Sequence, residues 1–243
     1  MSDAGVPSLF DLRIERKIYR DIKGAVVEAV RDLSLSVAPG EFVCLIGPSG
    51  CGKTTALKIL LGLDRDFDGD MRPAPEDLSV GVAFQEPRLL PWRTVEQNIR
   101  IALPALQRKR NLDGLFADMG LTDRRGHYPH ALSLGLARRA SLARALAIER
   151  QLLVLDEPLV SLDDRAAQEL RVCLLKPVTH HRMAVLMVTH NVREAIELAD
   201  RLVLLSERPA HLLDEIVIDR PRTNRPPAWI EQQHRELTGR LRP

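Results

Sequence analysis

Eight consecutive residues restrict the fold of this chain more than any other feature. From Gly47 to Thr54 they fit the pattern GxxxxGK[ST]. The apolar run Phe42 to Ile46 before them is typical of a buried strand, and the segment from Thr54 to Leu63 is typical of a helix. A glycine-rich turn between a strand and a helix points successive N–H groups inward, where phosphate binds. The sequence therefore predicts a phosphate-binding loop that opens a parallel α/β sheet.

The residue types in this loop suit the outer phosphates of a nucleotide. The Lys53 ammonium can neutralise phosphate charge, and the Thr54 hydroxyl can coordinate Mg²⁺. A glycine-rich turn with an exposed lysine is the alternative, which the flanking strand and helix disfavour. The residues expected to bind the nucleotide are Gly47, Pro48, Ser49, Gly50, Cys51, Gly52, Lys53, Thr54 and Thr55.

Further segments, several of them continuous apolar runs, predict more strands of a mainly parallel sheet, with helices between most of them. The stretch from Thr94 to Ala147 has helical periodicity and no convincing strand, which predicts an inserted helical lobe. A final helix is expected near Trp229 to Leu241. The predicted strands are Val80 to Phe84, Leu152 to Leu155, Ala184 to Val188, Leu202 to Leu205 and Leu213 to Ile218.

Composition excludes several classes of protein. The 243 residues, 45% hydrophobic and 28% charged, suit one compact unit with a subdomain. A net charge of +2 is too small for a nucleic-acid-binding face. No signal peptide or run of about 18 apolar residues is present, so we expect a chain that is neither exported nor membrane-spanning. The three cysteines, which form no CxxC pair, favour a reducing compartment.

A pair of acids follows the predicted strand Leu152 to Leu155. Asp156 is expected to hold Mg²⁺ together with Thr54, and Glu157 to polarise an attacking water. Taken alone, two acids after a strand are more often a solvated turn or a helix N-terminus. Asp156 lies 103 residues after Lys53 of the glycine loop, and this combination favours the chemical role.

Further motifs make the resemblance specific. Gln85, the segment Leu132 to Leu136, the segment Ser161 to Asp163 and His190 follow in the order found in the nucleotide-binding subunit of ABC transporters. The chain resembles that family from about residue 8 to residue 220. The resemblance implies a P-loop NTPase core with a mainly parallel sheet, an antiparallel β edge region and an inserted α-helical lobe.

The resemblance also implies roles for these residues. Gln85 approaches Mg²⁺ and the attacking water, and His190 contacts the γ-phosphate as a neutral or protonated donor. Ser133 and Gly135 of the signature motif, together with Asp163, contact the nucleotide. Read alone, Gln85 is a polar cap, Ser133 an N-cap and His190 a structural histidine. Tyr19 is the candidate for stacking on adenine.

The segment from Gln85 to Asn98 points to a subfamily. It contains Leu-Leu-Pro-Trp at Leu89 to Trp92, which resembles importer ATPases of the nitrate, sulfonate and taurine group. These residues are expected to receive a membrane partner, since an exposed apolar patch suits an interface. The alternative is that Trp92 belongs to the core of the helical lobe.

The chain departs from the family pattern at the signature motif. Leu134 stands where the family has glycine, and Leu136 where it commonly has glutamine. Leu134 is expected to keep a negative φ and to leave the site active. The connection from Leu63 to Val80 is short, so a hairpin common in the family is expected to be trimmed.

The resemblance implies an ATP-hydrolysing subunit that powers uptake of a small nitrate-, sulfonate- or taurine-like solute. The expected partners are a second copy, permease subunits and, indirectly, an extracytoplasmic solute-binding protein, at the cytoplasmic side of the inner membrane. The alternatives are a regulatory or degenerate subunit, or a non-transport ABC ATPase. We expect one ATPase domain over 1–243, with a helical subdomain at about 88–148 and a tail at about 219–243.

Overall fold

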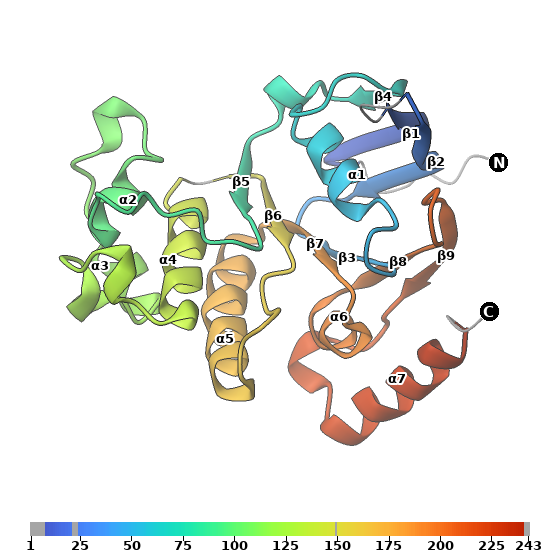
Figure 1. Ribbon diagram of the computed structural model, residues 1–243. Helices are drawn as coiled ribbons and strands as arrows, with labels where there is room; N and C mark the ends of the chain where they lie inside the picture. The colour runs from blue at the N-terminus through green and yellow to red at the C-terminus, as the bar shows by residue number, and fades with distance from the viewer. Residues whose placement is uncertain (1–7, 21–23, 149, 241–243) are drawn as a thin grey trace. The chain divides into compact units, whose positions relative to one another are not determined.

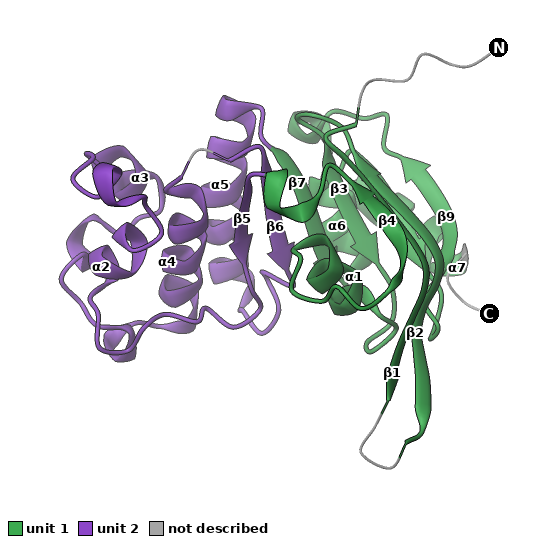
Figure 2. Ribbon diagram, turned by 90° about the horizontal axis from the view of Figure 1, so that it is seen from above, with its two compact units in different colours: residues 1–78, 184–243 green, residues 79–183 purple. Residues whose placement is uncertain are grey.

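The computed structural model describes residues 8–20, 24–148 and 150–240, which form two compact units (Figure 2). Unit 1 comprises residues 1–78 and 184–243, and unit 2 comprises residues 79–183. The expected end of the last helix at Leu241 lies outside the described residues. The elements of unit 1 are β1 (Phe10–Arg20), β2 (Val26–Val37), β3 (Phe42–Ile46), α1 (Lys53–Leu60), β4 (Asp68–Arg72), the 3₁₀ helix η1 (Pro75–Asp77), β7 (Ala184–Thr189), α6 (Val192–Leu198), β8 (Arg201–Leu205), β9 (Leu212–Val217), η5 (Arg222–Asn224) and α7 (Pro227–Arg240).

The larger sheet of unit 1 carries the glycine-rich loop. Its strands lie in the order β7, β3, β8, β9, and β3 pairs in parallel with both β7 and β8 (Figure 1). Every residue of β3 and β7 is buried, as expected of strands that are covered on both faces. β9 pairs antiparallel with β8, so the prediction of a mainly parallel sheet with an antiparallel edge is confirmed.

A second, three-stranded antiparallel sheet has the order β2, β1, β4. In β1 the buried residues Phe10, Leu12 and Ile14 alternate with exposed ones, so that one face of the sheet meets the core. β4 is the only strand in the fully described stretch from Leu63 to Ser79, and it pairs with β1. This segment therefore contributes one strand to the sheet, where we expected the family's hairpin to be shortened.

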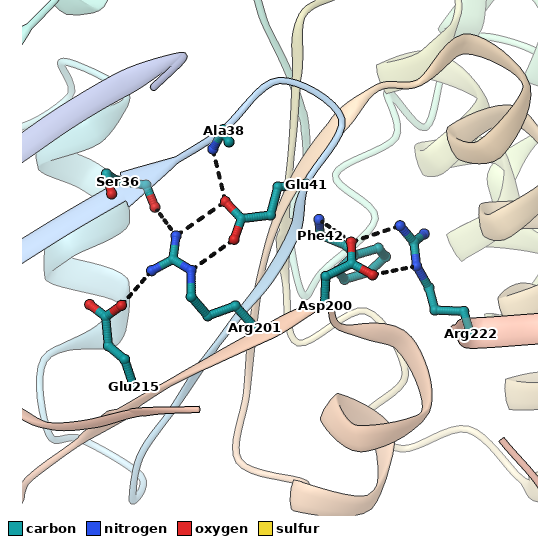
Figure 3. Close-up of polar contacts among 8 residues, drawn as sticks. All are labelled: Ser36, Ala38, Glu41, Phe42, Asp200, Arg201, Glu215 and Arg222. Carbon is teal, nitrogen blue, oxygen red and sulfur yellow. Dashed lines mark hydrogen bonds and ion pairs between the residues drawn. The ribbon is translucent and has the colours of Figure 1, made fainter. Parts of the chain in front are cut away.

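Two arginine–carboxylate groups hold the start of β3 in place (Figure 3). Arg201 donates to Glu41 at 2.8 and 3.1 Å, to the Ser36 carbonyl at 2.7 Å and to Glu215 at 2.7 Å. The hydrogen bond to Glu41 raises the pKa of Arg201 above its usual range. These bonds tie β2, β8 and β9 to the turn that leads into β3.

The second group is centred on Asp200, whose carboxylate accepts from the Phe42 backbone N–H at 2.9 Å and from Arg222 at 2.8 and 3.1 Å (Figure 3). Because β3 leads directly into the glycine-rich loop, both groups help to fix where the loop begins.

Farther along the chain, α7 packs on α6. No helix within the described residues is long and apolar enough to span a membrane.

Unit 2 contains two parallel strands and the helical stretch. β5 (Val80–Ala83) pairs with β6 (Leu152–Asp156), which is buried throughout. A Cβ at Gly81 would lie 2.5 Å from the Ala145 carbonyl oxygen, so glycine lets a helix pack closely against β5. Residues 94–147 form helices and turns without a strand, as predicted. The helices of unit 2 are α2 (Val95–Arg100), η2 (Ala105–Gln107), α3 (Asp113–Asp118), η3 (Thr122–Arg124), η4 (Pro129–Ala131), α4 (Leu134–Leu146) and α5 (Asp164–His181).

Candidate functional site

The glycine-rich loop follows β3 directly and ends at the start of α1. Gly52 has a φ of +139°, and a Cβ there would lie 2.6 Å from the Ala29 carbonyl oxygen, so only glycine fits. Lys53 is 5% exposed, and its ammonium donates to the carbonyls of Gly47 at 2.7 Å and Pro48 at 2.8 Å. The loop therefore curls around the lysine, as a phosphate cradle requires.

The rim of this loop is open to solvent. Pro48, Ser49, Gly50 and Thr54 are exposed, so the loop backbone and the Thr54 hydroxyl are accessible to a ligand. Arg208, from the turn between β8 and β9, donates two hydrogen bonds to the Gly50 carbonyl at 2.6 and 3.0 Å. Sequence reasoning missed Arg208 because it lies 158 residues from its partner.

Tyr19 stands beside the first turn of α1. Its hydroxyl lies 3.5 Å from Thr55 Oγ1 and donates to Asp64 at 2.9 Å, while Lys17 lies 4.8 Å from the centre of its ring. Burial raises the pKa of Tyr19, so the phenol stays neutral at physiological pH. Its side chain is 38% exposed, which leaves it accessible next to the loop.

The pair of acids lies at the end of β6 in unit 2. Asp156 ends the strand and is 9% exposed, whereas Glu157 is half-buried in the turn that follows. Glu157 has a φ of +45°, which is uncommon for a residue with a side chain and costs on the order of 1–3 kcal/mol. Such strain persists only where the surroundings hold it, and it is frequent at functional sites.

Gln85 is exposed just after β5, and the segment that follows it is held by a half-buried arginine of α4. Arg144 of α4 donates to the carbonyls of Pro87 at 2.8 Å and Arg88 at 2.7 Å. Burial lowers the pKa of Arg144 from its usual value. Trp92, in contrast, is 70% exposed, so the alternative that it belongs to the lobe core is wrong.

The signature motif opens α4. Ser133 is the N-cap, and its hydroxyl accepts from the Leu136 N–H at 3.4 Å. Leu134 is the first residue of α4 and does not have a positive φ, so it keeps the expected negative φ without backbone strain. It is 44% exposed. Gly135 is buried, and a Cβ there would lie 3.3 Å from Ala166 of α5. The signature motif therefore accommodates Leu134, whereas a side chain at Gly135 would crowd α5.

The remaining predicted residues lie at helix starts. Asp163 caps α5 by accepting from the Ala166 N–H at 2.8 Å, just after Ser161 with a φ of +61°. His190 is exposed between β7 and Asn191, the residue that caps α6. Asp163 belongs to unit 2 and His190 to unit 1.

The predicted site residues thus form two sets. Unit 1 brings the glycine-rich loop, Thr55 and Tyr19 together, and it also carries His190. Unit 2 carries the residues at the ends of β5 and β6 and at the starts of two helices, namely Gln85, Ser133, Gly135, Asp156, Glu157 and Asp163.

A strand, a glycine loop with a buried lysine and a following helix, within a mainly parallel sheet, define a P-loop nucleoside triphosphatase. The family model described as ABC transporter matches residues 30–160, more than half of the chain. The chain belongs to the ABC transporter family, and its activity is that family's hydrolysis of ATP.

Similar proteins cover most of the chain. An aliphatic sulfonates import ATP-binding protein of Burkholderia cenocepacia is 43% identical over 241 residues, which cover 96% of this chain and 87% of the relative. A protein of the same description from Pseudomonas aeruginosa is 43% identical over 230 residues, which cover 89% of this chain and 90% of the relative.

A solved structure supports the fold. The ATP-binding cassette MJ0796, in a dimeric post-hydrolysis state bound to ADP and Pi, superposes with a TM-score of 0.74 at 23% identity. The match covers 87% of this chain and 100% of that chain.

Proposed function

We propose that this chain powers the import of a small oxyanion-bearing solute of the aliphatic sulfonate, nitrate or taurine type. It acts as a homodimer, peripheral to the cytoplasmic side of the inner membrane, and drives a separate permease supplied by a solute-binding protein. The likeness to sulfonate import proteins over nearly the full length carries this proposal. The exposed Trp92 in the Leu89 to Trp92 segment supports it, because an apolar side chain held out in solvent suits a docking surface.

The ATPase reaction uses the residues in the following roles. Lys53 and the loop N–H groups bind the outer phosphates, and Tyr19 stacks on adenine. Glu157 accepts a proton from the attacking water, and Gln85 orients that water. His190 donates a hydrogen bond to the γ-phosphate as negative charge develops on it.

The donor set fits a magnesium ion. Thr54, Gln85 and Asp156 offer hydroxyl, amide and carboxylate oxygens, the ligand types that Mg²⁺ prefers. The exposed Thr54 hydroxyl and the position of Asp156 at a strand end are consistent with this role. When bound, the ion withdraws charge from the β- and γ-phosphates.

The second copy completes each site. Ser133 and Gly135 of one copy donate to the γ-phosphate on the other, and Asp163 lies in the turn that contacts the opposite nucleotide. Leu134 is compatible with this arrangement because it already adopts helical angles. The whole chain is one ATPase domain, with a helical subdomain at about 88–148 and a C-terminal tail at about 219–243.

The test compares Glu157→Gln with Lys53→Ala. Glu157→Gln keeps the shape of the site but removes the base, so it should bind MgATP and accumulate as a dimer in size-exclusion chromatography, with hydrolysis reduced at least about a hundredfold. Lys53→Ala should bind ATP weakly and stay monomeric. If Glu157→Gln stays monomeric with MgATP and hydrolyses it at the wild-type rate, the role of Glu157 is wrong.

A further inference from the structure

Arg138 links the helix of the signature motif to the turn that carries Glu157. It lies in α4 and is only 7% exposed. Its Nη1 donates to the Glu157 carbonyl at 3.0 Å and to the Pro158 carbonyl at 2.6 Å. One buried cation thus grips two consecutive carbonyls directly after the strand end, and hydrogen bonds from a charged donor are roughly twice as strong as neutral ones.

The backbone of this turn is strained and requires stabilising contacts. Glu157 has a φ of +45°, a conformation that a glutamate holds only when its surroundings stabilise it. The next residue, Pro158, has no N–H to donate, so its carbonyl is its one backbone group available for a hydrogen bond. Arg138 therefore bonds the turn at a residue that has only one backbone group for hydrogen bonding.

Packing leaves the turn some freedom. A small cavity lies beside it, lined by Arg138, Ser141, Pro158 and Leu159 together with apolar residues of β5, β6 and α5. Loosely filled space next to a strained turn would let the turn relax if the arginine were removed. Arg138 lines this cavity and its guanidinium also holds the carbonyls, so its removal both enlarges the space beside the turn and frees the carbonyls.

We propose that Arg138 is a positioning residue for Glu157, holding the left-handed turn so that the carboxylate points at the attacking water. This inference rests on the proposed role of Glu157. A general base must lie within about 3.2 Å of the proton that it takes, and a displacement of about 1 Å can cost up to about a hundredfold in rate. Because Ser133 caps the N-terminus of α4, Arg138 also fixes the signature residues relative to Glu157 within unit 2.

The experiment compares Arg138→Met, Arg138→Lys and Ser141→Ala. Arg138→Met keeps the length of the side chain but removes its donors, and Arg138→Lys restores a charged donor. Ser141 lines the same cavity and is 2% exposed, and its hydroxyl has no partner among the described residues, so Ser141→Ala is a matched control in the same helix. For each variant, kcat, the Kd for a non-hydrolysable ATP analogue and Tm are measured.

We expect Arg138→Met to lower kcat by about tenfold or more while the Kd changes by less than about twofold. Arg138→Lys should recover part of the loss, and Ser141→Ala should match the wild type in all three measurements. A wild-type kcat in Arg138→Met would overturn the inference. So would a parallel loss of nucleotide binding and Tm with no rescue by lysine, because this indicates a structural role only.

A Glu157→Gln variant, assayed alongside, separates the inference from the function on which it rests. If Glu157→Gln hydrolyses ATP at the wild-type rate, the proposed role of Glu157 fails and the inference fails with it. If Glu157→Gln is inactive and Arg138→Met is as active as the wild type, only the inference fails.

Discussion

Asn98 shapes the segment that presents Trp92, and its removal gives a prediction that can be worked out from its contacts. Asn98 is fully buried in α2. Its amide oxygen accepts from the Leu90 N–H at 2.7 Å, and its amide nitrogen lies 3.1, 3.0 and 3.0 Å from the carbonyls of Leu90, Arg93 and Thr94. One side chain thus closes the loop from Leu90 to Thr94.

The expected cost of Asn98→Ala follows from the groups that it leaves unpaired. The Leu90 carbonyl also accepts from the Arg93 N–H, and the Thr94 carbonyl from the Asn98 N–H, so both keep a partner. The Leu90 N–H and the Arg93 carbonyl depend on the Asn98 side chain within the described residues. At about 1–3 kcal/mol for each unpaired group, reduced because Leu90 and Arg93 are half-buried, unfolding free energy should fall by about 2–3 kcal/mol.

The assay is urea unfolding followed by circular dichroism, with Asn111→Ala as the matched control. Asn111 is exposed and its amide oxygen accepts from the Asp113 N–H at 2.7 Å, so the same substitution should cost less than about 1 kcal/mol there. Equal losses in the two variants, or a loss below about 1 kcal/mol for Asn98→Ala, would refute the reasoning.

Two further predictions concern the exposed Trp92 and the contact of Arg208 with the phosphate loop. Trp92→Glu should abolish copurification with the permease while Tm stays within about 2 °C of the wild type, because the side chain is 70% exposed; a falling Tm with retained copurification would contradict this. Arg208→Ala should raise the KM for ATP about fivefold with kcat within about twofold, because it frees the Gly50 carbonyl at the phosphate loop. Steady-state kinetics checks this, and a lower kcat at unchanged KM would count against it.

The linear sequence determined the phosphate loop, because its requirements are local. Gly52 must take a left-handed backbone, and the apolar run of β3 must be buried, whatever the rest of the chain does. The same holds for the strands β5 to β8, which are short and mainly apolar, and for the helical character of residues 94–147. Adjacent residues carry these signals, so they could be read before the fold was known.

The antiparallel sheet was less visible in the sequence. The resemblance implied a β edge region, but the bounds of β1, β2 and β4 were not predicted. β4, with the sequence Asp-Gly-Asp-Met-Arg, has almost no strand propensity, and it forms because β1 offers a free edge. Pairing with a distant partner decides such a strand.

Only the tertiary structure decided which arginines serve the site. The sequence from Ala137 to Ala147 has three arginines in one helix, and nothing local separates Arg138, which bonds a turn 19 residues away, from Arg139, which pairs with Glu169. Arg208 reaches across 158 residues to Gly50. The role of each arginine depends on which carbonyl or carboxylate the fold brings within hydrogen-bond distance. Such a bond, of about 3 Å, exists only once the chain has folded.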